Sequence, residues 1–276
     1  MCSMLNSTEW LRRILSNIKR EIQLYSFKML LPKNPCHDDV WLVEFPKSGV
    51  TWLAFLIANV NCKMTNRNVN INFYNINDFV PDIHVLRYLK DDLALYPGYR
   101  FIKSHSLYNP FYYKVIYLIR DPRSVMVSYY NFLVGLRLYS GSISTLIRGK
   151  KYGIDAWVKH VSEWIYDVSP DKRIFFIKYE ELLEDTTGCL NNLYCHLGLN
   201  VPETILKNAV ELSSRDKMKE LERLWKNGDL KFKAILKDFQ FVREAGASNY
   251  LNILSSEDVK YINKKAGDLM NMFGYL

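Results

Sequence analysis

Four short runs of apolar, β-type residues occur along the chain, and longer helical patterns separate them. The runs are Val40–Phe45, Tyr99–Ile102, Val115–Ile119 and Ile174–Ile177. The last two are continuously apolar and the first is broken only by Glu44, which is typical of strands buried on both faces. Helical patterns follow or precede them at Thr51–Asn61, Arg123–Leu136, Ile154–Asp167 and Glu180–Leu197. This alternation predicts an α/β fold in which helices flank a central, mostly parallel sheet in three layers.

The rest of the chain predicts one domain over residues 1–276. The 276 residues are 49% hydrophobic, enough for one well-packed core, and no repeat or low-complexity linker divides them. An amphipathic helix is expected at about residues 7–30, with Ser7 or Thr8 as its cap, and a capped helix at Ser255–Met272. Irregular structure is expected at 66–98, 141–153 and 222–250.

Charge and cysteine usage narrow the class of protein. A formal net charge of +8 favours anionic ligands, but the basic residues form no long tract, which argues against a dedicated nucleic-acid binder. The five cysteines are widely spaced without a CxxC pair, so zinc is not expected and a reducing cytoplasm is the simplest setting. No run approaches the roughly 20 apolar residues of a membrane span, so no stable membrane association is expected.

The turn after the first strand has the composition of an anion site. In "FPKSGVTW", residues 45–52, Gly49 lets the backbone approach an anion, and the helix that follows offers free N–H groups. No GK[ST] ends the turn, so it is not a Walker loop, although the strand–loop–helix arrangement is P-loop-like. A plain helix cap with Lys47 facing water is the alternative. The residues expected at the anion are Lys47, Ser48, Gly49, Val50, Thr51 and Trp52.

A second anion signal lies in the segment 114–133, "KVIYLIRDPRSVMVSYYNFL". Arg120 stands at the carboxyl end of the third strand, Pro122 suits the first position of a helix, and Ser128 lies within that helix. Arginine offers a forked set of donors for a phosphate, which a serine further along can support. Taken alone, a surface pair of Arg120 with Asp121 explains the segment better.

Together the two segments resemble the cytosolic branch of the sulfotransferase family. "PKSGVTW" and "IYLIRDPRSVMVSYYNF" match that family's motifs in order, separation and context, and the resemblance spans about residues 40–250. It implies an enzyme that uses PAPS (3′-phosphoadenosine-5′-phosphosulfate) and releases PAP (adenosine 3′,5′-bisphosphate). By this resemblance the loop at 45–52 binds the 5′-phosphosulfate, and Arg120 and Ser128 bind the 3′-phosphate.

Further positions match the same family. "FIKSHSLYNP" supplies Lys103 and His105, the family's lysine and catalytic histidine, and "FIKYEELLED" places Tyr179 near the adenine. "ELSSRDKMKE" implies the same for Ser213 and Arg215, although Arg215 replaces an aromatic residue. The C-terminal phosphate motif departs most, because only Arg243 is retained and Glu244 stands where the family has a lysine.

The resemblance also implies a mechanism. His105 takes the proton of the acceptor as general base, while Lys47 and Lys103 neutralise charge on the leaving oxygen and the sulfonate. Ser48 is expected to hold Lys47 back until the acceptor arrives. No metal is expected, because no acidic pair is placed like a magnesium site.

The acceptor is expected to be a small molecule, sulfated on a hydroxyl or alternatively on an amine or guanidine nitrogen. The nitrogen alternative depends on whether acids such as Asp78, Asp82, Asp91 and Asp92 face the site. The sequence predicts no particular oligomeric state. Two other functions stay open, a P-loop-type nucleotide kinase or ATPase and a non-catalytic anion or nucleic-acid binder. The candidate pocket residues are Phe73, Tyr74, Phe79, Tyr108, Phe111 and Tyr112.

Overall fold

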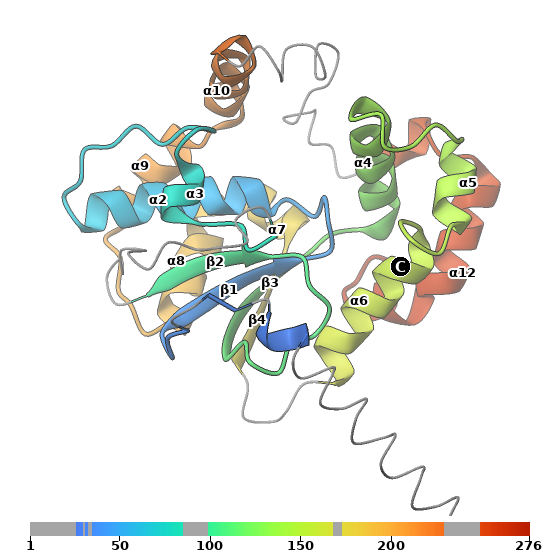
Figure 1. Cartoon of the computed structure of the whole chain (residues 1–276), viewed down its shortest axis with the longest axis horizontal. Helices are drawn as coiled ribbons and strands as arrows, with labels where there is room; N and C mark the ends of the chain where they lie inside the picture. Colours follow the sequence, from blue (N-terminus) through green and yellow to red (C-terminus); the bar gives the residue numbers. More distant parts are fainter. Residues whose placement is uncertain (1–25, 30, 33–34, 85–98, 168–172, 229–248) are drawn as a thin grey trace, which may run out of the picture.

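A computed structural model describes residues 26–29, 31–32, 35–84, 99–167, 173–228 and 249–276 (Figure 1). Within these residues the chain forms a parallel sheet with the strand order β2-β1-β3-β4. The strands are β1 (Asp39–Glu44), β2 (Arg100–Ser104), β3 (Lys114–Ile119) and β4 (Arg173–Lys178). The predicted α/β fold with a central parallel sheet is therefore confirmed.

Alternate residues of each strand pack into two different cores. In β1, Val40 and Leu42 face one core, and Trp41 and Val43 face the other. The first core is covered by α2 (Val50–Met64), α7 (Tyr179–Glu184), α8 (Thr186–His196) and α9 (Glu203–Leu212), with α3 (Ile76–Phe79) and α10 (Arg215–Gly228) beside them. The second is covered by α4 (Pro122–Gly135), α5 (Ile143–Arg148), α6 (Ile154–Tyr166) and α12 (Ser256–Met272). Figure 1 shows the resulting helix–sheet–helix layers.

Several expected boundaries were wrong for identifiable reasons. The helix predicted over 180–197 is two helices, because Asp185 leaves the helical conformation, with φ −133° and ψ 76°, and caps α8 by accepting the Gly188 N–H. The segment 141–153 was expected to be irregular but contains α5, which Ser142 caps. The region 222–250 begins inside α10 and ends with the short 3₁₀ helix η1 (Asn249–Asn252). Most of the predicted N-terminal helix at 7–30 lies outside the described residues.

The carboxyl ends of the strands gather the motif residues at one edge of the sheet. β1 runs directly into the loop before α2, β2 ends one residue before His105, β3 ends before Arg120, and β4 ends before Tyr179. Register pairs Val43 with Ser104 at this edge. In a parallel sheet this edge is where ligands bind. Among the helices that the structure describes, none is long and apolar enough to cross a membrane.

Candidate active site

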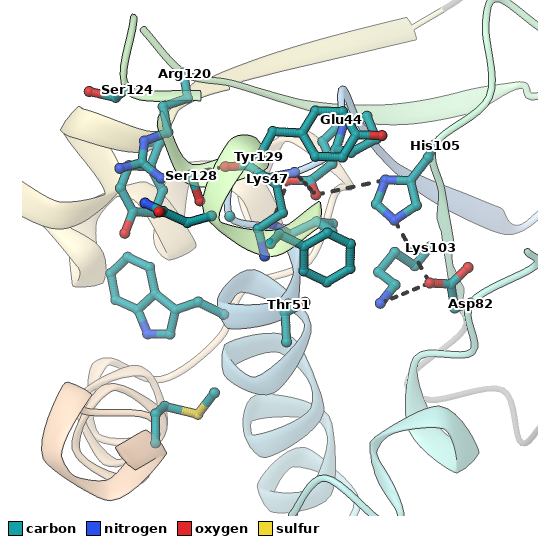
Figure 2. Close-up of a pocket in the computed structure, with 18 of the residues that line it drawn as sticks. Glu44, Lys47, Thr51, Asp82, Lys103, His105, Arg120, Ser124, Ser128 and Tyr129 are labelled. Carbon is teal, nitrogen blue, oxygen red and sulfur yellow. Dashed lines mark hydrogen bonds and ion pairs between the residues drawn. The ribbon is translucent and has the colours of Figure 1, made fainter. Parts of the chain in front are cut away.

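A cavity of about 950 Å³ opens at the carboxyl edge of the sheet. It brings together two groups of residues, one around Arg120 and the other around His105, with the loop before α2 between them (Figure 2). Most of the predicted site residues line it: Lys47, Gly49, Val50, Thr51, Trp52, Lys103, His105, Arg120, Ser128, Tyr179 and Arg215.

The loop before α2 has a backbone that suits an anion. Lys47 has φ 79° and Gly49 has φ 116°, so both lie in the left-handed region. A Cβ on Gly49 would come within 2.5 Å of Cδ2 of Tyr179, so glycine is required both by its backbone angle and by the closeness of this ring. The loop then leads into the first turn of α2, where the Val50 N–H is bound by Glu44 and the Trp52 N–H by the Gly49 carbonyl.

Glu44 is the functional candidate that the sequence analysis passed over. Its side chain is 4% exposed, and its two oxygens accept the backbone N–H groups of Val50, at 2.7 Å, and Lys47, at 3.2 Å. Burial raises the pKa of Glu44 to about 7, although the Val50 N–H and the charge of Lys47 act to lower it. The sequence did contain a signal that could have identified Glu44: it is an acidic residue in an otherwise apolar strand, immediately before the loop.

Ser48 and Lys47 take different places in the loop. The Ser48 hydroxyl does not face the cavity: the residue is 1% exposed, and its Oγ donates to the carbonyl of Phe45 at 2.9 Å. In this structure it therefore braces the turn, and its expected action on Lys47 stays a prediction. The Lys47 ammonium lies 4.5 Å from the centroid of the Phe132 ring, a cation–π contact beside the cavity.

Arg120 lies over Tyr179, with its guanidinium carbon 4.2 Å from the ring centroid. Its Nη1 donates to the Lys47 carbonyl at 3.4 Å, while its Nε is buried without a hydrogen-bond partner among the described residues. Asp121 caps α4 by accepting the Arg123 N–H, and this fixes the helix that carries Ser128. Ser124, one turn before Ser128 and also on the cavity, was missed although its four-residue spacing on a helix was a usable signal.

The residues expected at the adenine divide into a lining and a supporting group. Trp52 lines the cavity, and its indole Nε1 donates to the Ser213 carbonyl at 2.9 Å. Ser213 itself is 0% exposed, and its Oγ accepts from the side-chain amide of Asn59 at 3.0 Å. Ser213 therefore supports Trp52 from behind in this structure, and its predicted place near the adenine stays a prediction. Arg243 lies outside the described residues.

His105 lies between two acids. Its Nδ1 is 3.7 Å from Oε1 of Glu44, and its Nε2 is 3.8 Å from Oδ2 of Asp82, which also pairs with the Lys103 ammonium at 3.0 Å. Burial lowers the pKa of His105 to about 4, while the charge of Asp82 acts in the opposite direction. His105 is therefore neutral at pH 7, which is the form that accepts a proton.

His84 fixes the backbone of the same segment. Its Nε2 accepts the His105 N–H at 3.0 Å, so His84 is neutral and carries its proton on Nδ1 in this arrangement. Burial lowers the pKa of His84, which favours this neutral form. No local pattern in the sequence pointed to His84, because it reaches the site from a different segment of the chain.

The residues predicted for the acceptor pocket lie in different places, and only some of them line the cavity. Phe73 lines the cavity, whereas Tyr112 is 0% exposed and stacks on Trp41 with ring centroids 3.6 Å apart. Tyr74 is 58% exposed, and its hydroxyl donates to the Trp225 carbonyl. Of the four acids considered, Asp82 lines the cavity, Asp78 is exposed, and Asp91 and Asp92 lie outside the described residues. Outside the cavity lining lie Phe79, Tyr108 and Phe111; lining residues that the prediction missed include Met218, Trp225 and Phe132.

The comparisons with known proteins place this site in a family. A family model of the sulfotransferase domain matches residues 37–274, so the chain belongs to the sulfotransferase family. Mouse sulfotransferase 4A1 is 29% identical over 187 residues, which cover 63% of this chain and 64% of that protein. The match thus spans slightly less than two thirds of that relative. Rat sulfotransferase 2A6 is 28% identical over 254 residues, covering 86% of this chain and 87% of that protein.

Solved structures agree with the fold. Retinol dehydratase in a complex with retinol and PAP superposes with a TM-score of 0.64 at 21% identity, covering 86% of this chain and 82% of that one. Mouse sulfotransferase SULT7A1 complexed with PAP gives a TM-score of 0.62 at 21% identity, covering 90% and 88%. At these identities the likeness concerns the fold: a central parallel sheet with helices on both faces.

Proposed function

We propose that this protein transfers a sulfuryl group from PAPS to a hydroxyl, or to an amine or guanidine nitrogen, of a small molecule. One observation carries the proposal: an anion loop, a phosphate-type arginine and a neutral histidine open on the same cavity. The cavity volume of about 950 Å³ is sufficient for a nucleotide together with a small acceptor.

The residues present fit the two phosphate groups of PAP. The Gly49 cradle leaves no room for a side chain, and the buried Nε of Arg120 has no partner among the described residues. We assign the 5′ side to the loop at 45–52, and the 3′-phosphate to Arg120 with Ser124 and Ser128. Trp52 and Tyr179 would hold the base. When bound, PAPS supplies the sulfuryl group.

The chain's own residues would then move one proton and neutralise charge. His105 accepts the acceptor's proton, and the electron pair stays on the acceptor's oxygen or nitrogen for attack on sulfur. Lys47 and Lys103 stand where they can neutralise charge on the leaving oxygen and the sulfonate. Lys103 is paired with Asp82 in this structure, so it must exchange that carboxylate for its anionic partner.

The proposal also includes the class of acceptor and the cellular compartment. Retinol dehydratase was crystallised with retinol, and separately with androsterone, which supports a small, largely apolar acceptor for a related fold. The aromatic residues on this cavity, including Phe73, Phe132 and Trp225, suit such a molecule. The cysteines of the described part of the chain are free thiols, in keeping with a cytoplasmic setting.

Ligand-induced thermal shifts test the proposal against its alternatives. We expect PAP to raise the melting temperature more than ATP with magnesium does, because ATP lacks a 3′-phosphate. Arg120→Gln should abolish most of the PAP shift, whereas Arg67→Gln, which removes an exposed arginine, should preserve it. A larger shift from ATP with magnesium would favour a kinase or ATPase, and tight salt-dependent binding to DNA or RNA a nucleic-acid binder. A screen of phenols, alcohols, amines and guanidines for PAP release then identifies the acceptor class.

A further inference from the structure

Glu44 lies where the two chemical parts of the cavity meet. It is the last residue of β1, and a fully buried acid is rare unless its oxygens are partnered. Here both oxygens are bound by backbone N–H groups of the anion loop, Val50 on one and Lys47 on the other. The same carboxylate faces His105, as the dashed contact in Figure 2 shows.

The two nitrogens of His105 have different surroundings. Nδ1 is buried and without a hydrogen-bond partner among the described residues, and Oε1 of Glu44 is 3.7 Å away. That distance is too long for a hydrogen bond and short enough to become one with a small rotation. Since Nδ1 is closed off from the cavity, a molecule in the cavity must meet the ring through Nε2.

Asp82, the acid near Nε2, already has other hydrogen-bond and ion-pair partners. Asp82 lies 3.8 Å from Nε2, but its Oδ2 binds the Lys103 ammonium and its Oδ1 accepts the backbone N–H of His84. Asp82 therefore already pairs with an ammonium, whereas the hydrogen bonds that Glu44 accepts come from neutral backbone N–H groups. Glu44 is the acid that faces the nitrogen on the closed side.

We infer that Glu44 is a positioning residue that selects the working tautomer of His105. Its carboxylate accepts a hydrogen bond from the Nδ1–H, so the proton stays on Nδ1 and the lone pair of Nε2 faces the cavity. In the proposed reaction the acceptor's O–H or N–H proton moves to Nε2, and the bonding pair stays on the acceptor. The carboxylate then faces the resulting imidazolium and stabilises it, without itself taking a proton. The catalytic part of this inference rests on the proposed function, whereas the tautomer does not.

A second consequence concerns the loop. Because the same two oxygens hold the N–H groups of Lys47 and Val50, Glu44 ties the backbone of the anion loop to the orientation of the base. Protonation of Glu44 would loosen both, since a carboxylic acid can donate its O–H to Nδ1 and reverse the tautomer. The charged or titratable groups around Glu44 are Lys47, Lys103, His105, Tyr117 and Tyr179.

Histidine NMR on the ligand-free protein tests the tautomer directly. With ¹⁵N-labelled histidine and His105→Asn for assignment, we expect the wild-type His105 to be neutral and protonated on Nδ1 above pH 8. Glu44→Gln should move the population toward Nε2 protonation, because the amide donates where the carboxylate accepted. Glu180→Gln is the matched control: its carboxylate also accepts a backbone N–H, that of Asp121, and does not contact His105 in the structure, so the His105 signals should not change.

The pH profile of the transfer reaction provides the second readout. Activity should require the ionised carboxylate, so the wild-type rate should rise with pH through the pKa of Glu44, about 7. In Glu44→Gln the rate above pH 8 should fall roughly ten- to a hundredfold, and this acid limb should disappear. A purely structural role would lower the rate without removing the limb.

The outcomes separate the two proposals. Nε2 protonation of His105 in the wild type, or an unchanged tautomer in Glu44→Gln, would overturn the role of Glu44. The wild-type measurement decides the matter even if the variant fails to fold. A wild-type protein that shows the expected tautomer but no thermal shift with PAP would leave the positioning intact and defeat the proposed function instead.

Discussion

The two ends of the cavity are built in opposite ways. The end around Arg120 combines a glycine turn, a guanidinium that lies over Tyr179 with its Nε unpartnered among the described residues, and two serines on one helix. The end around His105 is made of side chains that already satisfy one another, with Asp82 bound to Lys103 and His84 to the His105 backbone. We infer that the first end is preformed for binding, and the second must exchange partners to act.

Because the two ends differ in this way, substitutions at each end should impair the protein differently. A change at the Arg120 end should alter ligand affinity and the fit of the loop. A change at the His105 end should alter charge balance, and with it rate and pH dependence, because each charged group there is a neighbour of another.

Replacing the base should have the largest effect. His105→Asn keeps the backbone N–H that donates to His84 but removes the proton acceptor, so the transfer rate should fall roughly 10²- to 10⁴-fold. Initial rates of PAP release with the best acceptor measure this, and the PAP thermal shift should persist because the other end is untouched. His37→Asn, which changes an exposed histidine, is the control. Retention of the wild-type rate in His105→Asn would remove the base from this end of the cavity.

The same contrast explains how far the sequence could predict this site. The Arg120 end follows from two contiguous segments, 45–52 and 114–133, and the parallel sheet brings their strand ends together, so residues such as Gly49 and Ser128 were identified correctly as cavity residues. Both ends of every strand were predicted to within two residues, because buried strands are apolar throughout their length.

The other site residues could not be predicted, because their positions depend on contacts between segments that are far apart in the sequence. His84 and Asp82 reach the site through a bridge between residue 82 and Lys103, outside the regular strands. Tyr112 looked like a pocket residue because it is aromatic and near His105 in sequence, yet it packs into the second core against Trp41. Packing direction, rather than residue type, decides between core and pocket.

Asp82 should show the next largest effect. Asp82→Asn leaves the Lys103 ammonium, whose side chain is 15% exposed, without its carboxylate, and we expect a loss of roughly 3 kcal/mol in the free energy of unfolding at pH 7. Burial raises the pKa of Asp82, but the charges of Lys103 and His105 outweigh it and the net pKa is lowered. Its stabilisation is therefore present above the ordinary value of 3.8 and is lost as pH falls through the lowered pKa.

Urea unfolding at several pH values checks this prediction. The difference between wild type and Asp82→Asn should shrink as the pH drops below 3.8, while Asp78→Asn, at an exposed acid on α3, should stay within about 0.5 kcal/mol of wild type. If Lys103→Met abolishes the effect of Asp82→Asn, the ion pair is its cause. Equal losses in both backgrounds would assign the effect to packing.

Gly49→Ala tests the preformed end. The new Cβ would meet the Tyr179 ring at 2.5 Å at a backbone φ of 116°, so the unfolding free energy should fall by about 2 kcal/mol and the PAP shift should largely disappear. Gly198→Ala separates the two causes, because Gly198 has φ 76° but no atom within 4 Å of an added Cβ. That variant should cost about 1 kcal/mol and leave the PAP shift unchanged. Equal effects of the two variants would show that the ring contact is unimportant.

Replacing Ser213 should change stability and PAP affinity the least. This variant tests whether Ser213, which lies behind Trp52, contacts the nucleotide. Because its Oγ accepts from Asn59 at 3.0 Å and its carbonyl holds the Trp52 indole, Ser213→Ala removes one buried acceptor and keeps the indole contact. The unfolding free energy should fall by about 1 kcal/mol, while the affinity for PAP, measured by calorimetry, should change less than about twofold. A loss of PAP affinity of tenfold or more, with stability unchanged, would instead mean that Ser213 touches the nucleotide and that Trp52 moves when it binds.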